Sequence, residues 1–383
     1  MKFSVLDKKI KSRLIYISLF NVTLFTTTLA GAEWSRGKYL MLGMTWEDFL
    51  FGFNFSLPFL GILTVHEFGH YFTARYHHIK VSLPYYIPMW LGFIGVPSIG
   101  TMGAFIRIKA QIVSRTKYFD VGVSGPITGF VVAVLVLWYG FTNLPEESYI
   151  YEIHPEYLEY NSLDEAIEAG EGTVIFLGGN LLFDFFKDYV ADPDKVPHPN
   201  EIIHYPWLFA GYLALFFTAL NLLPMGQLDG GHVLFGLFGA KNHAIISRVL
   251  FTGYLFYAGL GWITIEDLKN NSLESFGLFI FNLAAYLYLL YLCAFSFFKD
   301  AQTRLLYATI LLTLQFFAAS IFKVEGYPAW IVFSLFIGRV IGIDHPPVTD
   351  NQPLSPGRKI LGWVALVIFI LCFSPQPLKV EGL

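Results

Sequence analysis

Residues 66 to 70 of the chain read His-Glu-Phe-Gly-His, a pattern that can bind and use a metal ion. On an α-helix, histidines four positions apart lie on one face, one turn apart, so His66 and His70 can bind the same ion. Glu67 can then reach a water molecule on that ion. Zinc is the expected metal because it takes imidazole nitrogens, keeps an open position in catalytic sites and lowers the pKa of bound water to about 7.

The third protein ligand that catalytic zinc needs is not close in the sequence. From residue 71 to residue 119 there is no aspartate or glutamate, and the histidines of this stretch are His77 and His78. We expect these two to be interfacial residues at a helix end. The third ligand must therefore come from farther along the chain.

Three acidic residues are candidates for that ligand: Asp120, Asp229 and Asp344. Asp120 opens an apolar span and could serve as its N-cap. Asp344 lies in a proline-rich loop, where a role in a turn is the alternative. Asp229 belongs to a Leu-Asp-Gly-Gly sequence at the inner end of a span that runs in the same direction as the HEFGH helix. We therefore expect Asp229 and the two histidines at one depth.

The composition indicates a membrane protein. Of 383 residues, 55% are hydrophobic and 14% charged, whereas soluble domains carry about 25% charged residues. The apolar residues form long stretches, and both cysteines, Cys293 and Cys372, lie inside them, which argues against a disulfide framework. Secreted disulfide scaffolds, disordered tails and nucleic-acid binders are excluded. HEFGH could also be a packed histidine pair beside an unrelated acid. The apolar span disfavours this alternative, because ionisable groups inside a membrane span cost free energy and need a partner or a function.

The expected fold is an all-α polytopic membrane protein with about eight or nine transmembrane helices and a small re-entrant β element beside the active site. The expected spans are 14–30, 50–76, 119–142, 207–225, 248–265, 275–298, 305–322, 329–343 and 360–374. We prefer an uncleaved first helix to a signal peptide because its apolar run is long. Three parts follow: an N-terminal helix and outer loop (1–49), a catalytic membrane core (50–250) and C-terminal helices (251–383).

Charge predicts the orientation. The first thirteen residues hold five basic side chains against Asp7 alone, and residues 79–118 hold five basic side chains and no acid. By the positive-inside rule both segments are cytoplasmic, which agrees with the count of spans between them. We expect a multi-pass membrane protein with a cytoplasmic N-terminus.

Residues 144–206 form the long polar stretch of the chain. Between Glu146 and Glu201 they carry fourteen acidic residues and two lysines, as expected of an extracytosolic loop that could fold as a small cap. Within this loop, residues 174–190 have apolar side chains at helical spacing. We expect them to form a helix along the membrane surface.

Two motifs together resemble the site-2 protease family of intramembrane zinc metalloproteases. HEFGH lies on one span, and Asn221-Leu-Leu-Pro-Met-Gly-Gln-Leu-Asp229-Gly on another matches the family signature NPxPxxxLDG except that Leu222 replaces the first proline. That departure, together with PSIGTMGAFIRIK and FDVGVSGPITGF, is similar to the branch without a PDZ domain, found in bacteria and chloroplasts. The resemblance covers about residues 50–250, and it implies a bacterial cell (inner) membrane as the location.

The resemblance implies that His66, His70 and Asp229 bind Zn²⁺ and that Glu67 is the general base. It implies a substrate that is a transmembrane segment of another protein, cut within or beside the lipid bilayer. Asn221 would hold substrate backbone or the developing oxyanion, although an asparagine in a span can also simply bond a neighbouring helix. The small-residue sequence from Gly122 to Gly129 allows close helix packing.

A scissile peptide must be extended, because helical carbonyls are engaged in internal hydrogen bonds. Residues 101–109 alternate Ile106 and Ile108 with basic residues behind a glycine-rich loop, a strand-like pattern. We expect a re-entrant element whose edge binds substrate by strand addition, with an ordinary interfacial loop as the alternative. The candidate substrate-binding residues are Gly100, Thr101, Met102, Gly103, Ala104 and Phe105.

Three other functions fit some of these features. A transporter or metal-ion carrier could use the His and Asp cluster as an ion site, but it predicts internal repeats between the two halves, which the sequence lacks. An inactive scaffold would be expected to have lost Glu67. Membrane HExxH peptidases of the prenyl-protein type use a glutamate as third ligand, which the LDGG sequence disfavours. Substrate identity and oligomeric state are not encoded in any of these patterns.

Overall fold

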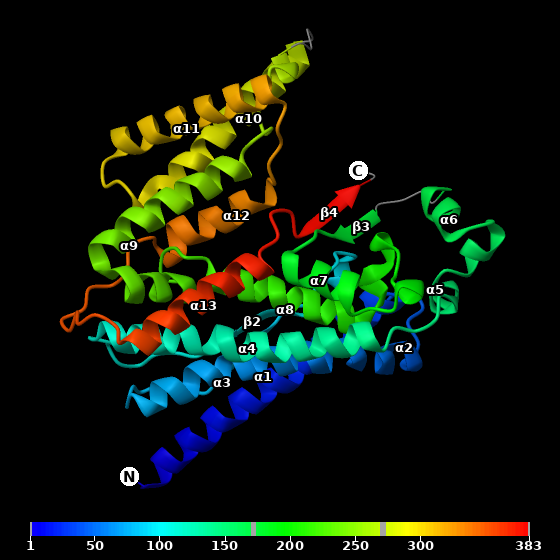
Figure 1. Cartoon of the computed structure of the whole chain (residues 1–383), viewed down its shortest axis with the longest axis horizontal. Coiled ribbons are helices and arrows are strands. Elements are labelled where there is room, and N and C mark those ends of the chain that lie inside the picture. Colours follow the sequence, from blue (N-terminus) through cyan, green and yellow to red (C-terminus); the bar gives the residue numbers. More distant parts are fainter. Residues whose placement is uncertain (1, 170–173, 269–272, 382–383) are drawn as a thin grey trace. The chain divides into compact units, whose positions relative to one another are not determined.

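The computed structural model describes residues 2–169, 174–268 and 273–381, and the chain is mainly helical (Figure 1). The helices are α1 (Lys2–Arg36), α2 (Trp46–Phe51), α3 (Phe53–Tyr76), α4 (Arg115–Thr142), α5 (Ser148–Ile153), α6 (Leu163–Ala169), α7 (Leu181–Tyr189), α8 (Pro206–Leu222), α9 (Asp229–Ala258), α10 (Leu273–Cys293), α11 (Ala301–Phe322), α12 (Ala329–Phe336) and α13 (Pro356–Cys372). The strands are β1 (Tyr85–Pro88), β2 (Thr101–Phe105), β3 (Val174–Leu177) and β4 (Leu378–Glu381).

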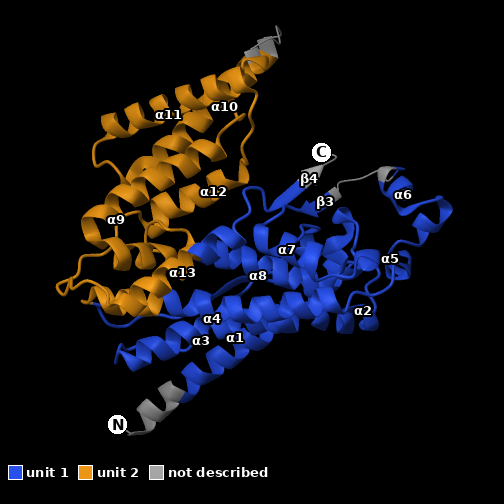
Figure 2. Cartoon of the chain, in the orientation of Figure 1, with its two compact units in different colours: residues 1–112, 123–221, 367–383 blue, residues 113–122, 222–366 orange. Residues whose placement is uncertain are grey.

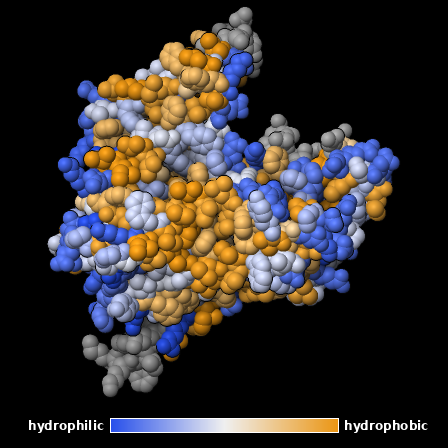
Figure 3. All heavy atoms as spheres, in the orientation of Figure 1, coloured by the Kyte–Doolittle hydropathy of each residue, from blue (hydrophilic) through white to orange (hydrophobic). Residues whose placement is uncertain are grey.

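Among the described residues, five helical segments are long and apolar enough to cross a membrane. They are Ile10–Arg36, Trp46–Tyr76, Arg115–Thr142, Ser275–Ser296 and Ala301–Phe322, and Pro206–Leu222 and Ala329–Ile341 are shorter apolar helices. The expected all-α polytopic membrane protein is confirmed, whereas the count of eight or nine crossings stays a prediction. Figure 3 shows broad hydrophobic areas on the face in view, and exposed apolar side chains such as Leu135 and Trp138 lie on the candidate span α4.

The predicted span 248–265 was wrong in its bounds. Helix α9 starts at Asp229, is kinked at Gly239, where φ is 77°, and ends at Ala258. The apolar pattern therefore places the helix correctly only over its second half. The first half, residues 229–247, lay between two predicted spans and was not predicted to be helical.

The chain divides into two compact units (Figure 2). Unit 1 comprises residues 1–112, 123–221 and 367–383, and unit 2 comprises residues 113–122 and 222–366. The division of the sequence into an N-terminal part, a catalytic core and C-terminal helices stays a prediction.

In unit 1, β1 and β2 form the expected small β element. They pair antiparallel, with Tyr86 opposite Ala104 and Pro88 opposite Thr101, so β2 holds one residue more than β1 and contains a bulge. The predicted strand 101–109 was too long. Beyond Phe105 an isolated bridge joins Ile108 to Val81, because the pairing strand β1, which sequence reasoning missed, begins only at Tyr85, opposite Phe105.

The 144–206 loop contains more structure than expected. Residues 174–177, expected to be helical, form β3, which pairs with β4 near the C-terminus, so the helix α7 begins only at Leu181. Tyr212 of α8 holds this sheet in place, since its hydroxyl oxygen lies 2.6 and 2.7 Å from the carbonyl oxygens of Gly178 and Pro377 and can donate to one of them at a time. A strand partner 200 residues away overrides the local helical spacing.

Candidate metal site

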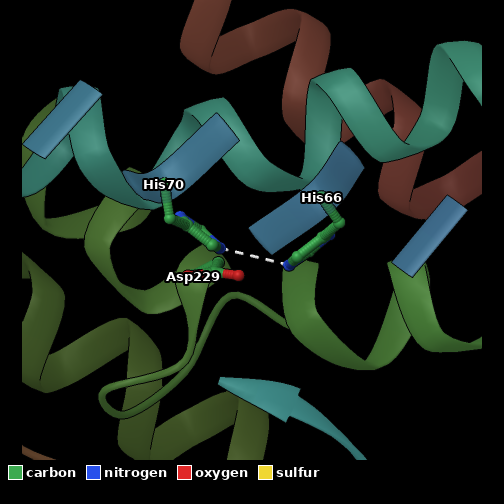
Figure 4. A group of neighbouring side chains, drawn as sticks. All are labelled: His66, His70 and Asp229. Carbon is green, nitrogen blue, oxygen red and sulfur yellow. Dashed lines mark hydrogen bonds between the residues drawn. The ribbon is translucent and has the colours of Figure 1, made fainter. Parts of the chain in front are cut away.

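The HEFGH motif lies on α3, as predicted, and its three ionisable residues are buried. His66, Glu67 and His70 are 6%, 5% and 7% exposed. The Nε2 atoms of the two imidazoles face each other at 3.1 Å across one helical turn (Figure 4). Two ligands of a tetrahedral zinc ion are separated by roughly 3.3 Å, so the pair fits one zinc ion.

Helix α4 contacts the same face of α3 through glycines. A Cβ on Gly125 would overlap the imidazole of His70, and one on Gly129 would lie 3.0 Å from Cβ of His66. A Cβ on Gly69 of α3 would likewise lie only 2.8 Å from the carbonyl oxygen of Ser124. The predicted close packing at residues 122–129 is thus confirmed, and it limits the positions that the histidine rings can adopt.

Asp229 is the first residue of α9 in unit 2 and is partly buried. The loop before it is held in place by Ser247, whose hydroxyl accepts from the Gly226 amide at 2.8 Å and donates to the Ile343 carbonyl at 3.1 Å. These contacts fix the backbone that presents the Asp229 carboxylate.

Figure 4 labels the side chains of His66 and His70 on α3 and of Asp229 at the start of α9. Two imidazoles and one carboxylate make the donor set of a catalytic zinc site with an open fourth position. The histidines belong to unit 1 and the aspartate to unit 2. The complete ligand set is therefore argued as a proposal below.

The two competing acids are engaged elsewhere. Asp120 lies in the second turn of α4, so its prediction as an N-cap was wrong, and it accepts two hydrogen bonds from Arg358 at 2.7 and 2.8 Å. Asp344 accepts two from Arg248 at 3.0 and 2.9 Å. His77 and His78 follow the end of α3 at Tyr76, as expected.

The hairpin of β1 and β2 packs against α3 and α1. Tyr86 of β1 shares a hydrogen bond of 2.8 Å with Thr64, less than one turn before the HEFGH motif. Gly100 contacts the backbone of α1, and its carbonyl accepts from the Thr26 hydroxyl at 2.7 Å. The hairpin is thereby tied to the helix that carries the histidines.

The six candidate substrate-binding residues divide into two kinds. Gly100 and Thr101 are buried, and the Thr101 hydroxyl donates to the carbonyl of Ile87 at 2.8 Å, so both serve the hairpin itself. Met102 and Phe105 are 63% and 47% exposed. Gly103 and Ala104 lie between them and are partly exposed.

Sequence reasoning missed two histidine clusters. His232, one turn after Asp229, lies with its Nδ1 atom 2.9 Å from Nε2 of His345. His154 and His204 lie beside Glu201 in the 144–206 loop. The predictions for that loop rested on its net charge and on the apolar spacing of residues 174–190, although its histidines were the available signal for a cluster.

The family described as "Peptidase family M50" matches residues 54–260. Curated relatives include "Probable zinc metalloprotease EGY2, chloroplastic" of Oryza sativa subsp. indica, 28% identical over 60% of this chain and 37% of its own length. "Probable zinc metalloprotease EGY1, chloroplastic" of Arabidopsis thaliana is 29% identical over 48% of this chain and 29% of its own length. The chain thus covers 37% and 29% of the lengths of these two relatives. No solved structure matches significantly.

Proposed function

The chain belongs to peptidase family M50, the site-2 protease family, and on that basis we propose that it is an intramembrane zinc metalloprotease. It would hydrolyse peptide bonds within or beside transmembrane segments of other membrane proteins. The observation that carries this proposal is the buried pair of imidazoles on α3, 3.1 Å apart, with Glu67 between them in the sequence. Three ionisable side chains buried in one apolar helix need a common function.

The proposed zinc ligands are His66, His70 and Asp229. The Leu-Asp-Gly-Gly sequence supports Asp229, and so does the engagement of Asp120 and Asp344 by arginines. Asp229 also has the more suitable position, since a residue at the start of a helix is held by its first turn while its side chain extends beyond the helix end.

Peptide hydrolysis at this site would use the zinc ion, Glu67 and Asn221. Bound zinc would lower the pKa of a water molecule to about 7 and polarise the scissile carbonyl. Glu67 accepts the proton of the attacking water at its carboxylate and later delivers a proton to the leaving amine nitrogen. Asn221, in the last turn of α8, donates from its amide to the carbonyl oxygen that gains negative charge.

The substrate segment would bind in an extended conformation along β2. The support is local: β2 belongs to a two-stranded sheet, packs on α3 and exposes Met102 and Phe105. Main-chain pairing of this kind tolerates many side chains, which suits an enzyme whose substrates share a conformation more than a sequence.

The protein is an integral membrane protein, and we propose a bacterial cell membrane with a cytoplasmic N-terminus. The orientation is supported by the basic residues among the first thirteen and in segment 79–118. The curated relatives are named as chloroplastic, so a chloroplast membrane is the alternative location. A transporter, the alternative function, has no support in the family match.

Metal content tests the proposal without knowledge of the substrate. Purified Asp229→Ala should contain one zinc ion per chain fewer than wild type, because two imidazoles alone hold zinc weakly. Asp344→Ala is the matched control, since it removes an acid whose partner is Arg248, and it should keep the wild-type zinc content. Equal zinc content in Asp229→Ala and wild type would overturn the assignment of the third ligand.

A further inference from the structure

A second cluster of metal-ligating side chains lies in the 144–206 loop of unit 1. His154 follows α5, whereas Glu201 and His204 belong to the 3₁₀ helix Pro199–His204 that directly precedes α8. Three of their atoms approach one another closely. Nε2 of His154 and Nε2 of His204 are 3.3 Å apart, and they lie 3.8 and 3.6 Å from Oε2 of Glu201.

These distances match a common metal ligation. The point equidistant from the three atoms lies about 2.1 Å from each, which is the usual length of zinc bonds to imidazole nitrogen and carboxylate oxygen. In the absence of an ion, two imidazole nitrogens 3.3 Å apart can share one proton at most.

The surrounding groups orient the ligands. Nδ1 of His154, the ring nitrogen away from the cluster, lies 2.9 Å from Oε1 of Glu156. Oε1 of Glu201, the oxygen away from the cluster, accepts from the Tyr157 hydroxyl at 3.0 Å. Histidine ligands of metals usually donate their second nitrogen to a carboxylate in this way, which fixes the ring and its tautomer.

Burial makes an ion the natural partner of Glu201. The residue is 4% exposed, and its Oε2 atom is buried without a hydrogen bond to any described residue. Neither lysine nor arginine pairs with it in the described chain, and an uncompensated buried carboxylate is costly.

An ion can reach the cluster from solvent. The His154 side chain is 24% exposed. Glu201 also lines a cavity of about 370 Å³ together with Glu147, Asp164 and Asp194. The lining of this cavity contains one lysine, Lys195, so acidic groups outnumber basic groups in it. This excess of acidic groups favours entry of a cation.

We propose that His154, Glu201 and His204 form a second metal site, which binds a divalent zinc-type ion with water as the fourth ligand. The ion links the chain after α5 to the segment that enters α8, two points 47 residues apart. It therefore stabilises the folded loop and is distinct from the site on α3.

The test counts zinc in the full-length protein after the α3 site has been removed. In His66→Ala/His70→Ala, one zinc ion per chain should remain, and adding His154→Ala should remove it. His198→Asn, added instead, is the control for a histidine of the same loop. His198 accepts from the Asn200 amide through Nδ1, a cap that asparagine can replace, so this variant should keep the ion.

A milder variant separates metal binding from folding. Glu156 is exposed, so Glu156→Gln should leave the fold intact while weakening zinc binding about 10-fold to 100-fold through loss of the bond to His154. Glu159→Gln, exposed in the same turn, should bind zinc as tightly as its parent. Both changes are made in the His66→Ala/His70→Ala protein. Bound zinc is removed with a chelator, and the affinity of each variant is then measured by titration with zinc.

Two results would overturn this second site. One is a His66→Ala/His70→Ala protein without zinc, while wild type binds one ion, and this result leaves the proposed protease function standing. The other is zinc that persists after His154→Ala is added. If instead wild type and His66→Ala/His70→Ala held equal zinc, the α3 site would fail and the loop site would remain.

Discussion

At the scale of single residues, Glu67 and the two histidines differ in what their loss should do. The Nε2 atoms of His66 and His70 lie 3.1 Å apart, where one ion can bind both. Glu67, directly after His66 in the sequence, is proposed as the base and not as a ligand. A ligand holds the ion, and a base acts on the water. The two roles can therefore be separated by experiment.

Glu67→Gln should keep the zinc content of wild type and lose proteolysis by about 10²-fold to 10⁴-fold, because an amide cannot accept the proton of the attacking water. The measurement is zinc content together with release of a tagged fragment from a panel of single-span membrane proteins. Activity near wild type in this variant would refute the assignment of Glu67 as the base.

At the scale of elements, the site depends on the contact of α3 with α4. The histidine rings lie against Gly125 and Gly129, where any side chain would occupy the space of an imidazole. Helices in membranes approach closely at small residues, and here the close approach also limits the ligands to few orientations.

Gly125→Ala should reduce zinc binding and abolish most proteolysis, because the added methyl group overlaps the His70 imidazole. Gly61→Ala is the matched control on α3, since a Cβ there has no atom within 4 Å. Zinc content and fragment release are compared at equal protein amounts in the membrane. Normal zinc binding in Gly125→Ala would mean that His70 can rotate away without losing the ion.

The hairpin gives a second prediction at this scale. Met102→Pro should depress cleavage while leaving zinc bound, because proline removes a main-chain donor from β2 and the metal ligands lie on other elements. Met102→Leu replaces the same exposed side chain and keeps the donor, so it should cleave nearly as wild type does. Full activity in Met102→Pro would show that β2 is structural only and that helices hold the substrate.

At the scale of the whole molecule, orientation follows from charge and from the helices between charged segments. The acidic 144–206 loop and the basic 79–118 segment are joined by α4, which is long enough to cross a bilayer. They should therefore lie on opposite sides of the membrane. Cys293 and Cys372 are both buried, so introduced cysteines can be labelled against a low background.

A cysteine at Ser162 should react with an impermeant thiol reagent added to intact cells, and a cysteine at Gln111 should react only after lysis. Both positions are exposed, whereas Ser114 is buried and would be protected on either side. Labelling of Gln111→Cys but not Ser162→Cys in intact cells would invert the proposed topology.

Periodic and local features of this protein were predictable from the sequence. The spacing of His66 and His70 places both on one face of any helix, and long apolar runs specify membrane spans without reference to the rest of the chain. Asp229 was predicted as the third ligand from the family resemblance and from its position at the end of a span. Where the decisive partner is close in sequence, pattern and structure agree.

Only the tertiary structure decided what depends on distant partners. The strand β3 forms because residues 378–381 pair with it, and Asp120 is bound because Arg358 lies beside it, 238 residues away. The cluster of His154, Glu201 and His204 joins two segments that the sequence separates by 47 residues. Helical periodicity is a property of neighbouring residues, whereas strand pairing, ion pairing and metal ligation depend on which surfaces the folded chain brings together.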